Sequence, residues 1–297
     1  MSDRLNEIVE RAKTGDQKAL EGVVREVQDQ VHHLAMRMLV NPDDALEATQ
    51  EILILVVTKL STFEGKSAFK TWVYRVAANY LFTAQKVRNR DLGLNFEMFR
   101  HDLESGLVPE ATPSGEDEVW LNELRISCTM AMLLCLDVKH RMTYVLGDIL
   151  DLDQAEAAEI LCLSKANFRK RLSRARNEVV AFTTNHCGIA NETAKCSCPR
   201  RLPAARKLGR IPKKGDGQAP TYATKSAPDY NSVISGVKSL EQELRTLKLQ
   251  RATPEFVSPN DFAVRLSEIL DPDIALAKQS SPSGAPPTNN NGSDLIH

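Results

Sequence analysis

The spacing of apolar residues constrains the fold of this chain more than any other feature. Between positions 17 and 40, apolar side chains recur every three or four residues, which is the period of an amphipathic α-helix. The same spacing returns within 43–60, 69–81, 124–136 and 168–182. Aromatic residues make up only 5% of the chain, which favours an aliphatic helical core over an all-β core. The sequence therefore predicts an all-α fold.

Residues that favour helix N-termini stand in front of several of these stretches. Asn41 precedes a proline and two carboxylates, which suit the first turn and the positive end of the helix dipole. Ser67 is expected to cap the next helix, and Asp153 begins a capping-box-like start of a later, short one. Ser164 is expected to cap a long helix that runs to about Phe182. A short helix, a tight turn and a long basic helix have the outline of a helix-turn-helix.

The length and composition predict more than one domain. A chain of 297 residues is about twice as long as a usual domain. Glycine, proline and acidic residues with weak periodicity indicate a linker between two helical parts. We expect a helical domain at 1–90, a flexible acidic linker at 91–115, a second helical domain at 116–183, and a Cys-containing, Pro/Gly-rich extension at 184–297 that is largely disordered apart from a helix at 232–250.

Charge is strongly segregated along the chain, although the net charge is only −1. Residues 59–90 carry 7 basic and 1 acidic side chains, and residues 164–214 carry 14 and 2. The stretch between them, 91–163, carries 4 basic and 15 acidic side chains. Solvated helix faces can explain one such basic block, but two blocks around an acidic stretch predict two contacts with a polyanion such as DNA.

Several classes of protein are disfavoured by what the sequence lacks. It has no Gly-rich phosphate loop, no His-Glu-x-x-His motif and no nucleophile elbow, so we do not expect an enzyme. The apolar run from Ile52 to Val57 is far shorter than a membrane-spanning helix, and the start of the chain lacks a signal-peptide pattern. We therefore expect a cytoplasmic protein without membrane insertion, whose six cysteines are thiols or metal ligands.

The basic helix after Ser164 suits the major groove of DNA. On a helical wheel, its apolar residues fall in one stripe and its cations and amides fall on the opposite side. Arginine can bond guanine in a bidentate manner, asparagine can bond adenine, and lysine neutralises phosphate. The candidate DNA-binding residues are Ser164, Lys165, Asn167, Arg169, Lys170, Arg171 and Arg174, and Arg176 is a candidate for a phosphate contact.

Two blocks of the chain resemble one family. The stretch from Leu136 to Arg176, which ends in Lys-Arg-Leu-Ser-Arg-Ala-Arg, resembles the DNA-binding region of bacterial RNA polymerase sigma factors, particularly the extracytoplasmic-function (ECF) group. The earlier blocks Asp43–Ile52 and Phe69–Leu81 resemble the promoter-melting domain of the same proteins. This implies a dissociable specificity subunit whose partners are core RNA polymerase and promoter DNA, and whose basic helix reads the minus-thirty-five element. The resemblance also allows an anti-sigma factor as a partner.

The resemblance also implies roles in the first block. Its acidic helix would contact a coiled coil of the polymerase largest subunit through Asp43, Asp44, Glu47, Gln50 and Glu51. The loop at 62–67 would hold an extruded base of the minus-ten element, with Phe63 stacking on it. The minus-ten candidates are Phe63, Lys70, Trp72, Arg75 and Asn79, and the residues assigned to phosphates also include Lys86, Arg88 and Arg90. Trp72 can equally be a core residue.

Two alternatives remain beside the sigma factor. One is a stand-alone helix-turn-helix regulator that dimerises, for instance through a helix at 232–250. The other is a redox or metal sensor whose output is DNA binding.

The sensor alternative rests on four soft donors that lie within 13 residues, His186, Cys187, Cys196 and Cys198. They could bind one zinc ion, form a thiol redox switch, or have no special chemistry. Cys128, Cys135 and Cys162 lie on apolar helix faces and are expected to be small core residues.

Overall fold

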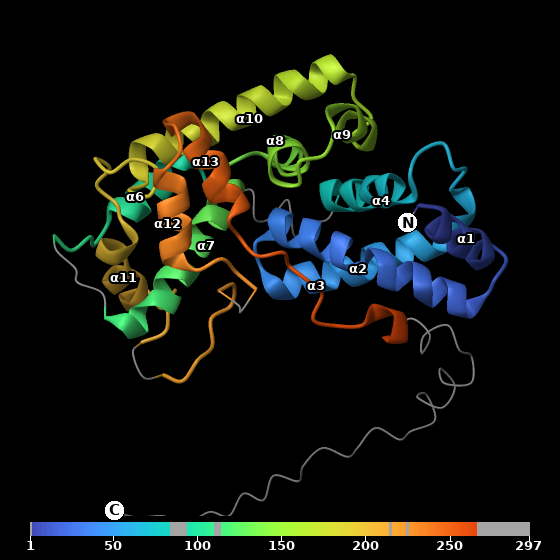
Figure 1. Cartoon of the computed structure of the whole chain (residues 1–297), viewed down its shortest axis with the longest axis horizontal. Coiled ribbons are helices and arrows are strands. Elements are labelled where there is room, and N and C mark those ends of the chain that lie inside the picture. The colour runs from blue at the N-terminus through green and yellow to red at the C-terminus, as the bar shows by residue number, and fades with distance from the viewer. Residues whose placement is uncertain (1, 84–93, 110–113, 214–215, 224–225, 266–297) are drawn as a thin grey trace, which may run out of the picture.

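The computed structural model describes residues 2–83, 94–109, 114–213, 216–223 and 226–265, and in these ranges every regular element is a helix (Figure 1). An all-α fold is therefore confirmed. None of the described helices is long and apolar enough to cross a membrane. The α-helices are α1 (Ser2–Lys13), α2 (Gln17–Leu39), α3 (Pro42–Thr58), α4 (Phe69–Thr83), α6 (Phe96–Glu104), α7 (Glu118–Leu134), α8 (Val138–Tyr144), α9 (Gln154–Ile160), α10 (Lys165–His186), α11 (Cys198–Lys207), α12 (Tyr230–Lys238) and α13 (Gln242–Arg251).

Helices α1 to α4 form the N-terminal bundle, and local capping sets most of its helix ends. The Asp16 carboxylate accepts the backbone N–H of Ala19 at 3.0 Å and starts α2. Asn41 accepts the N–H of Asp44 at 2.9 Å and starts α3, as predicted. The start of α4 differs from the prediction, because its first helical bond runs to the carbonyl of Ala68, which takes the cap position in place of Ser67.

Helices α7 to α10 form the second bundle. Asp153 accepts the N–H of Ala155 at 2.7 Å, and Ser164 accepts the N–H of Asn167 at 3.2 Å, so both predicted caps are confirmed. Between α8 and α9 the chain makes a π-helical turn, η3 (Val145–Ile149). The long helix α10 runs a full turn beyond Phe182.

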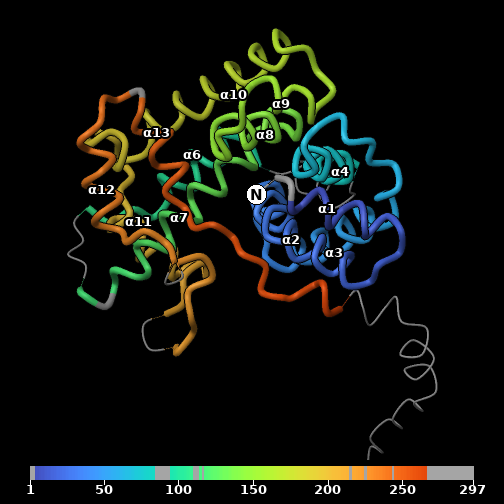
Figure 2. Tube along the Cα trace, turned by 45° about the vertical axis from the view of Figure 1, so that its right-hand side comes forward, coloured from blue at the N-terminus to red at the C-terminus, as the bar shows by residue number. Residues whose placement is uncertain are grey.

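The two bundles share one apolar core instead of standing apart. Buried side chains of α2, α3 and α4 belong to the same cluster as those of α8, α9 and α10, and Figure 2 shows α4 beside α8 and α9. Arg141 of α8 is fully buried and donates to the carbonyl of Met38, at the end of α2, at 2.7 Å. Within the stretch predicted as a linker, α6 packs on α10, where the Phe99 and Phe182 rings stack at 5.4 Å.

The described residues between 184 and 265 are more ordered than the sequence indicates, because distant side chains hold them. Helices α11, α12 and α13 pack against α7 (Figure 1). Residues 221–223 belong to a stretch expected to be flexible, yet the Glu123 carboxylate of α7 accepts their three backbone N–H groups at 2.7–3.1 Å. The single helix predicted at 232–250 is broken into α12 and α13. Arg245 stabilises the break by donating to the carbonyls of Leu240 and Ala190, each at 3.0 Å.

Residues 252–265, which we call the strap, run from α13 along α2 (Figure 1). The backbone N–H of Phe256 donates to Nδ1 of His33 at 2.9 Å. Further along, Ser258 N–H donates to Asp29 at 2.9 Å and Phe262 N–H donates to Gln28 at 3.0 Å. The strap thus fastens the extension to the N-terminal bundle.

Candidate nucleic-acid interface

The face of α10 opposite its apolar stripe is a cationic surface. The stripe predicted to pack inward is buried, and it consists of Phe168, Leu172, Ala175, Val179 and Phe182. On the other side, six of the predicted DNA-binding residues are exposed and Arg171 is partly buried. The exposed residues are Ser164, Lys165, Asn167, Arg169, Lys170 and Arg174.

Part of this surface is concave. An open hollow of about 340 Å³ lies between α10 and the start of α8, and Asn167, Lys170, Arg171 and Arg174 line it. Lys139 and His140 line the same hollow from α8, and the sequence analysis did not select them. The basic run Lys139-His140-Arg141 at the start of a helix could have indicated a cationic surface there. Only Lys139 and His140 reach the surface, because Arg141 is buried.

Arg176 has a structural partner. Its guanidinium donates twice to the buried Asp148 carboxylate, at 2.8 and 2.5 Å. This hydrogen-bonded pairing raises the pKa of Arg176 above its usual value. Lys165 and Arg169 line a neighbouring hollow together with Arg176.

At the start of α4, aromatic rings form a packed cluster. Phe63 is only 6% exposed, and its ring lies 5.2 Å from the Phe69 ring and 5.6 Å from the Trp72 ring, measured between centroids. The Lys13 ammonium lies 5.1 Å from the Phe63 ring centroid. Trp72 is partly exposed, whereas Asn79, two turns further along α4, is exposed.

Polar groups of α4 contact the second bundle. Arg75 donates to the Glu159 carboxylate of α9 at 2.9 Å, and the Thr71 hydroxyl donates to Glu156 at 2.7 Å. Lys70, in contrast, forms an ion pair with Glu26 of α2 at 3.0 Å. The other three basic residues assigned to phosphates, Lys86, Arg88 and Arg90, lie outside the described residues.

The first turns of α3 present an acidic surface. Asp43, Glu47 and Glu51 are exposed, whereas Asp44 and Gln50 are partly buried. The opposite face of α3 packs into the N-terminal bundle through Ala45, Ala48, Thr49, Ile52, Leu53 and Val56. The five predicted polymerase-binding residues therefore belong to one helix with a fixed inner face.

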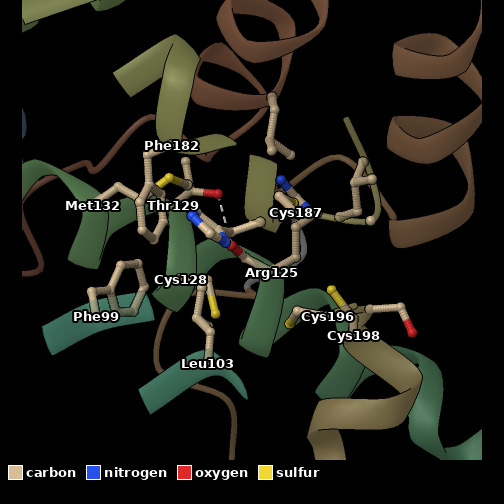
Figure 3. A pocket seen from close by; sticks show the side chains of 15 residues that line it. Phe99, Leu103, Arg125, Cys128, Thr129, Met132, Phe182, Cys187, Cys196 and Cys198 are labelled. Carbon is tan, nitrogen blue, oxygen red and sulfur yellow. Dashed lines mark hydrogen bonds between the residues drawn. The ribbon is translucent and has the colours of Figure 1, made fainter. Parts of the chain in front are cut away.

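The cysteines are arranged differently from the sequence expectation. Cys187, Cys196 and Cys198 line one pocket together with Cys128 of α7 (Figure 3). His186 also lines this pocket, but its ring packs against Phe182, with centroids 5.0 Å apart, and Nδ1 lies 3.6 Å from Glu104.

Two predicted core cysteines lie elsewhere. Cys135 is partly buried, and its thiol donates to the Ala131 carbonyl at 3.7 Å. The prediction for Cys162 is wrong, because that residue is exposed at the turn after α9, where its φ is 53°.

Comparisons with known proteins identify the family of the chain. Residues 23–90 match the Sigma-70 region 2 family model. The ECF RNA polymerase sigma-E factor of Haemophilus influenzae is 34% identical over 188 residues, which cover 60% of this chain and 96% of that protein. The chain belongs to the ECF RNA polymerase sigma factors.

Other ECF sigma factors are similar over a comparable span. The sigma-E factor of Escherichia coli K12 is 31% identical over 185 residues, covering 60% of this chain and 95% of that protein. SigW of Bacillus subtilis is 28% identical over 176 residues, covering 57% of this chain and 90% of that protein. A solved structure of CnrH, in complex with the cytosolic domain of CnrY, is 21% identical, with a TM-score of 0.42 and coverage of 59% of this chain and 93% of that chain.

Membership in this family settles the class of function. ECF sigma factors are subunits of RNA polymerase that act in transcription initiation, and they are regulatory proteins rather than enzymes. These relatives align with 57% to 60% of this chain, so this sigma factor has a large part without a counterpart in them.

Proposed function

We propose that this sigma factor directs core RNA polymerase to promoters in the cytoplasm through three separate surfaces. The acidic start of α3 binds a coiled coil of the largest polymerase subunit, α4 and the loop before it engage the minus-ten element, and α10 reads the minus-thirty-five element. The N-terminal bundle then corresponds to sigma region 2 and the second bundle to region 4. The observation that carries the proposal concerns the two faces of α10: one face is cationic and exposed, and the opposite face is apolar and buried in the core.

The role of α10 is supported by the geometry of its front. Asn167, Lys170 and Arg174 line one hollow, so amide and cationic groups face the same volume. Such groups supply both base-edge bonds and phosphate contacts. Lys139 at the start of α8 adds a cation at the rim, where it suits the DNA backbone.

The role of α4 is supported by its exposed polar side chains. Asn79 is free to read a base edge, and Trp72 offers a partly exposed ring. Phe63 packs behind Trp72, so in this arrangement its contribution is to hold the tryptophan in place. Direct stacking of Phe63 on an extruded base requires the aromatic cluster to open.

The two bundles must separate before both promoter elements can be bound. The element names place them about 25 base pairs apart, which is roughly 85 Å of B-DNA at 3.4 Å per base pair. In the structure, α4 and α9 touch through Arg75–Glu159 and Thr71–Glu156. These bonds therefore belong to a closed form of the free protein, and binding to core polymerase favours an open one.

The role of α3 can be tested by reversing its charge. The double variant Asp44→Lys/Glu47→Lys should raise the dissociation constant for core polymerase at least about tenfold, or about 1.4 kcal/mol, because like charges then face each other. The control Glu7→Lys/Glu10→Lys makes the same charge change on exposed residues of α1 and should have little effect. Equal affinities of the two double variants, measured by titration with labelled protein, would exclude α3 as the contact.

A further inference from the structure

The extension is attached to the rest of the molecule by direct contacts. In the described residues, no three or more His, Cys, Asp or Glu side chains are grouped so that they could hold a metal ion. The four residues considered for zinc, His186, Cys187, Cys196 and Cys198, therefore do not form a metal site. The extension is held by packing on α7 and, near the end of α13, by hydrogen bonds to both bundles.

The end of α13 and the strap touch both bundles within a few residues of chain. Arg251 donates to the backbone carbonyl of Asp148 at 2.7 Å and to the Asp151 carboxylate at 2.6 Å, both between α8 and α9 of the second bundle. Five residues later, Phe256 is bonded to α2 of the N-terminal bundle. A single short stretch of chain therefore ties the two bundles together (Figure 2).

The strap is fastened to α2 largely through its own backbone. Three side chains of α2, Gln28, Asp29 and His33, accept the backbone N–H groups of Phe262, Ser258 and Phe256, at 3.0, 2.9 and 2.9 Å. An exposed ion pair between Arg25 and Asp261, with Nε and Oδ2 3.2 Å apart, adds to these bonds. Because the strap is tethered to the second bundle, all of these contacts form within one molecule and do not depend on its concentration.

Two aromatic side chains anchor the strap. Phe262 is 3% exposed and belongs to the core that the two bundles share. The centroid of the Phe256 ring lies 5.6 Å from that of the His33 ring and 5.4 Å from Cζ of Arg37. Val257, directly after Phe256, is 62% exposed. Neighbouring strap residues thus differ sharply in how much they contribute to holding it.

The junction of α2 and α13 contains buried polar groups that are incompletely hydrogen-bonded. Arg37 is 2% exposed and donates to the Gln250 carbonyl at 3.4 Å, but its Nε has no hydrogen-bond partner among the described residues. Gln250 is 0% exposed, and neither polar atom of its side chain has such a partner. Burial lowers the pKa of Arg37 to about 9, because the cation is removed from water. Opening returns these groups to water, which offsets part of the contact energy that is lost and makes the closed form releasable.

We propose that the extension is an intramolecular lock: while the strap lies on α2 the protein is held closed, and release of the strap allows the bundles to separate. This rests on the proposed function, in which the bundles engage promoter elements too far apart for the closed form. Core polymerase binds the open form, so its apparent affinity for the free protein is reduced by the fraction of molecules that are open. The lock keeps the free sigma factor from engaging polymerase until the strap leaves α2.

Hydrogen exchange of the full-length protein measures opening without polymerase. In Phe256→Ala, the backbone amides of the strap and those of α4 and α9, where the bundles touch, should exchange about tenfold faster than in the parent. Val257→Ala shortens the exposed neighbouring side chain and should exchange like the parent. Faster exchange in the strap with unchanged α4 and α9 would overturn the lock, because the bundles would then stay together without it.

Affinity for core polymerase measures the consequence. Phe256→Ala should bind core polymerase about tenfold more tightly than the parent, and Val257→Ala should bind like the parent. Unchanged affinity of a Phe256→Ala protein that exchanges faster would overturn the inhibitory role. Absence of binding by every protein, the parent included, would instead overturn the proposed function and with it the inhibitory role, and the exchange data alone would then show whether the strap holds the bundles together.

The ion pair between Arg25 and Asp261 gives a second test that leaves the packing intact, since these side chains are 48% and 46% exposed. Asp261→Arg places two cations together and should raise both the exchange rates and the polymerase affinity about two- to fivefold. The charge swap Arg25→Asp/Asp261→Arg should return both quantities to the parent values. A swapped protein that remains as open as Asp261→Arg would contradict the docking of the strap on α2.

Discussion

At the loop before α4, Phe63 is enclosed by Phe69, Trp72 and the Lys13 ammonium. The resemblance to sigma factors singled this residue out for base stacking, but it gave no information about which aromatic ring faces inward. That choice depends on contacts between α1 and the loop before α4, which helical spacing alone does not reveal.

Alanine substitutions distinguish the buried Phe63 from the exposed Asn79 by their effects on the free energy of unfolding. Phe63→Ala should lower the free energy of unfolding by about 3–5 kcal/mol, because it leaves a cavity in the aromatic cluster. Asn79→Ala should change it by no more than about 0.5 kcal/mol, since the side chain is exposed. The Asn79 variant should instead impair promoter melting, measured by permanganate footprinting. Equal unfolding energies for the two variants, measured in denaturant, would show that Phe63 is not a core residue.

His33 is a second residue whose role comes from distant packing. Burial against the strap lowers its pKa from 6.5 to about 3, and the nearby charges of Arg37 and His32 act in the same direction. The neutral ring accepts the N–H of Phe256. Between these two pH values the unfolded chain binds a proton that the folded chain does not, so stability falls as the pH falls through this window.

Removing this titrating group should reduce that loss. We expect His33→Gln, which keeps a hydrogen-bond acceptor, to lose less stability than the parent between pH 7 and pH 5. Urea unfolding at a series of pH values measures the difference. Parallel curves for the two proteins would mean that His33 is not protected from protonation in the folded state.

At the scale of the helices, local bonds were predictable and distant ones were not. The caps Asn41, Asp153 and Ser164 depend on groups within three residues, so the sequence was sufficient to place them. The break between α12 and α13 depends on Arg245, which reaches Ala190, 55 positions away. The order of residues 221–223 depends likewise on Glu123. Neither contact leaves a periodic pattern in the sequence.

The front of α10 should show the difference between base reading and structural support. Alanine at Asn167, Arg169 or Lys170 should cost about 1–3 kcal/mol wherever a bidentate base bond is lost and should relax the preference at one position. Arg176→Ala should mainly reduce folding stability, because it leaves the buried Asp148 carboxylate without its cation. Lys207→Ala, on an exposed residue of α11, serves as the control. Binding to a library of duplex sites measures the base preference, and unfolding in denaturant measures the stability of the Arg176 variant. An unchanged preference in all three front variants would contradict the orientation of α10.

For the whole molecule, the structure adds an extension that packs on both bundles. Its helices cover α7 and its strap follows α2, so it holds together parts that the proposed function requires to separate. The separate basic blocks could be read from the sequence, and the division into two domains stays a prediction. The shared core could not, because it depends on contacts such as Arg141 with Met38, more than a hundred residues apart.

Run-off transcription with purified core polymerase over a promoter library tests the central claim most directly. The full-length protein should give discrete transcripts from a subset of templates, and these should weaken when Asp44 and Glu47 are both changed to Lys. The templates used should share two elements spaced for the separated bundles. Transcripts no more abundant or specific than those of core polymerase alone, obtained with folded protein, would contradict the account.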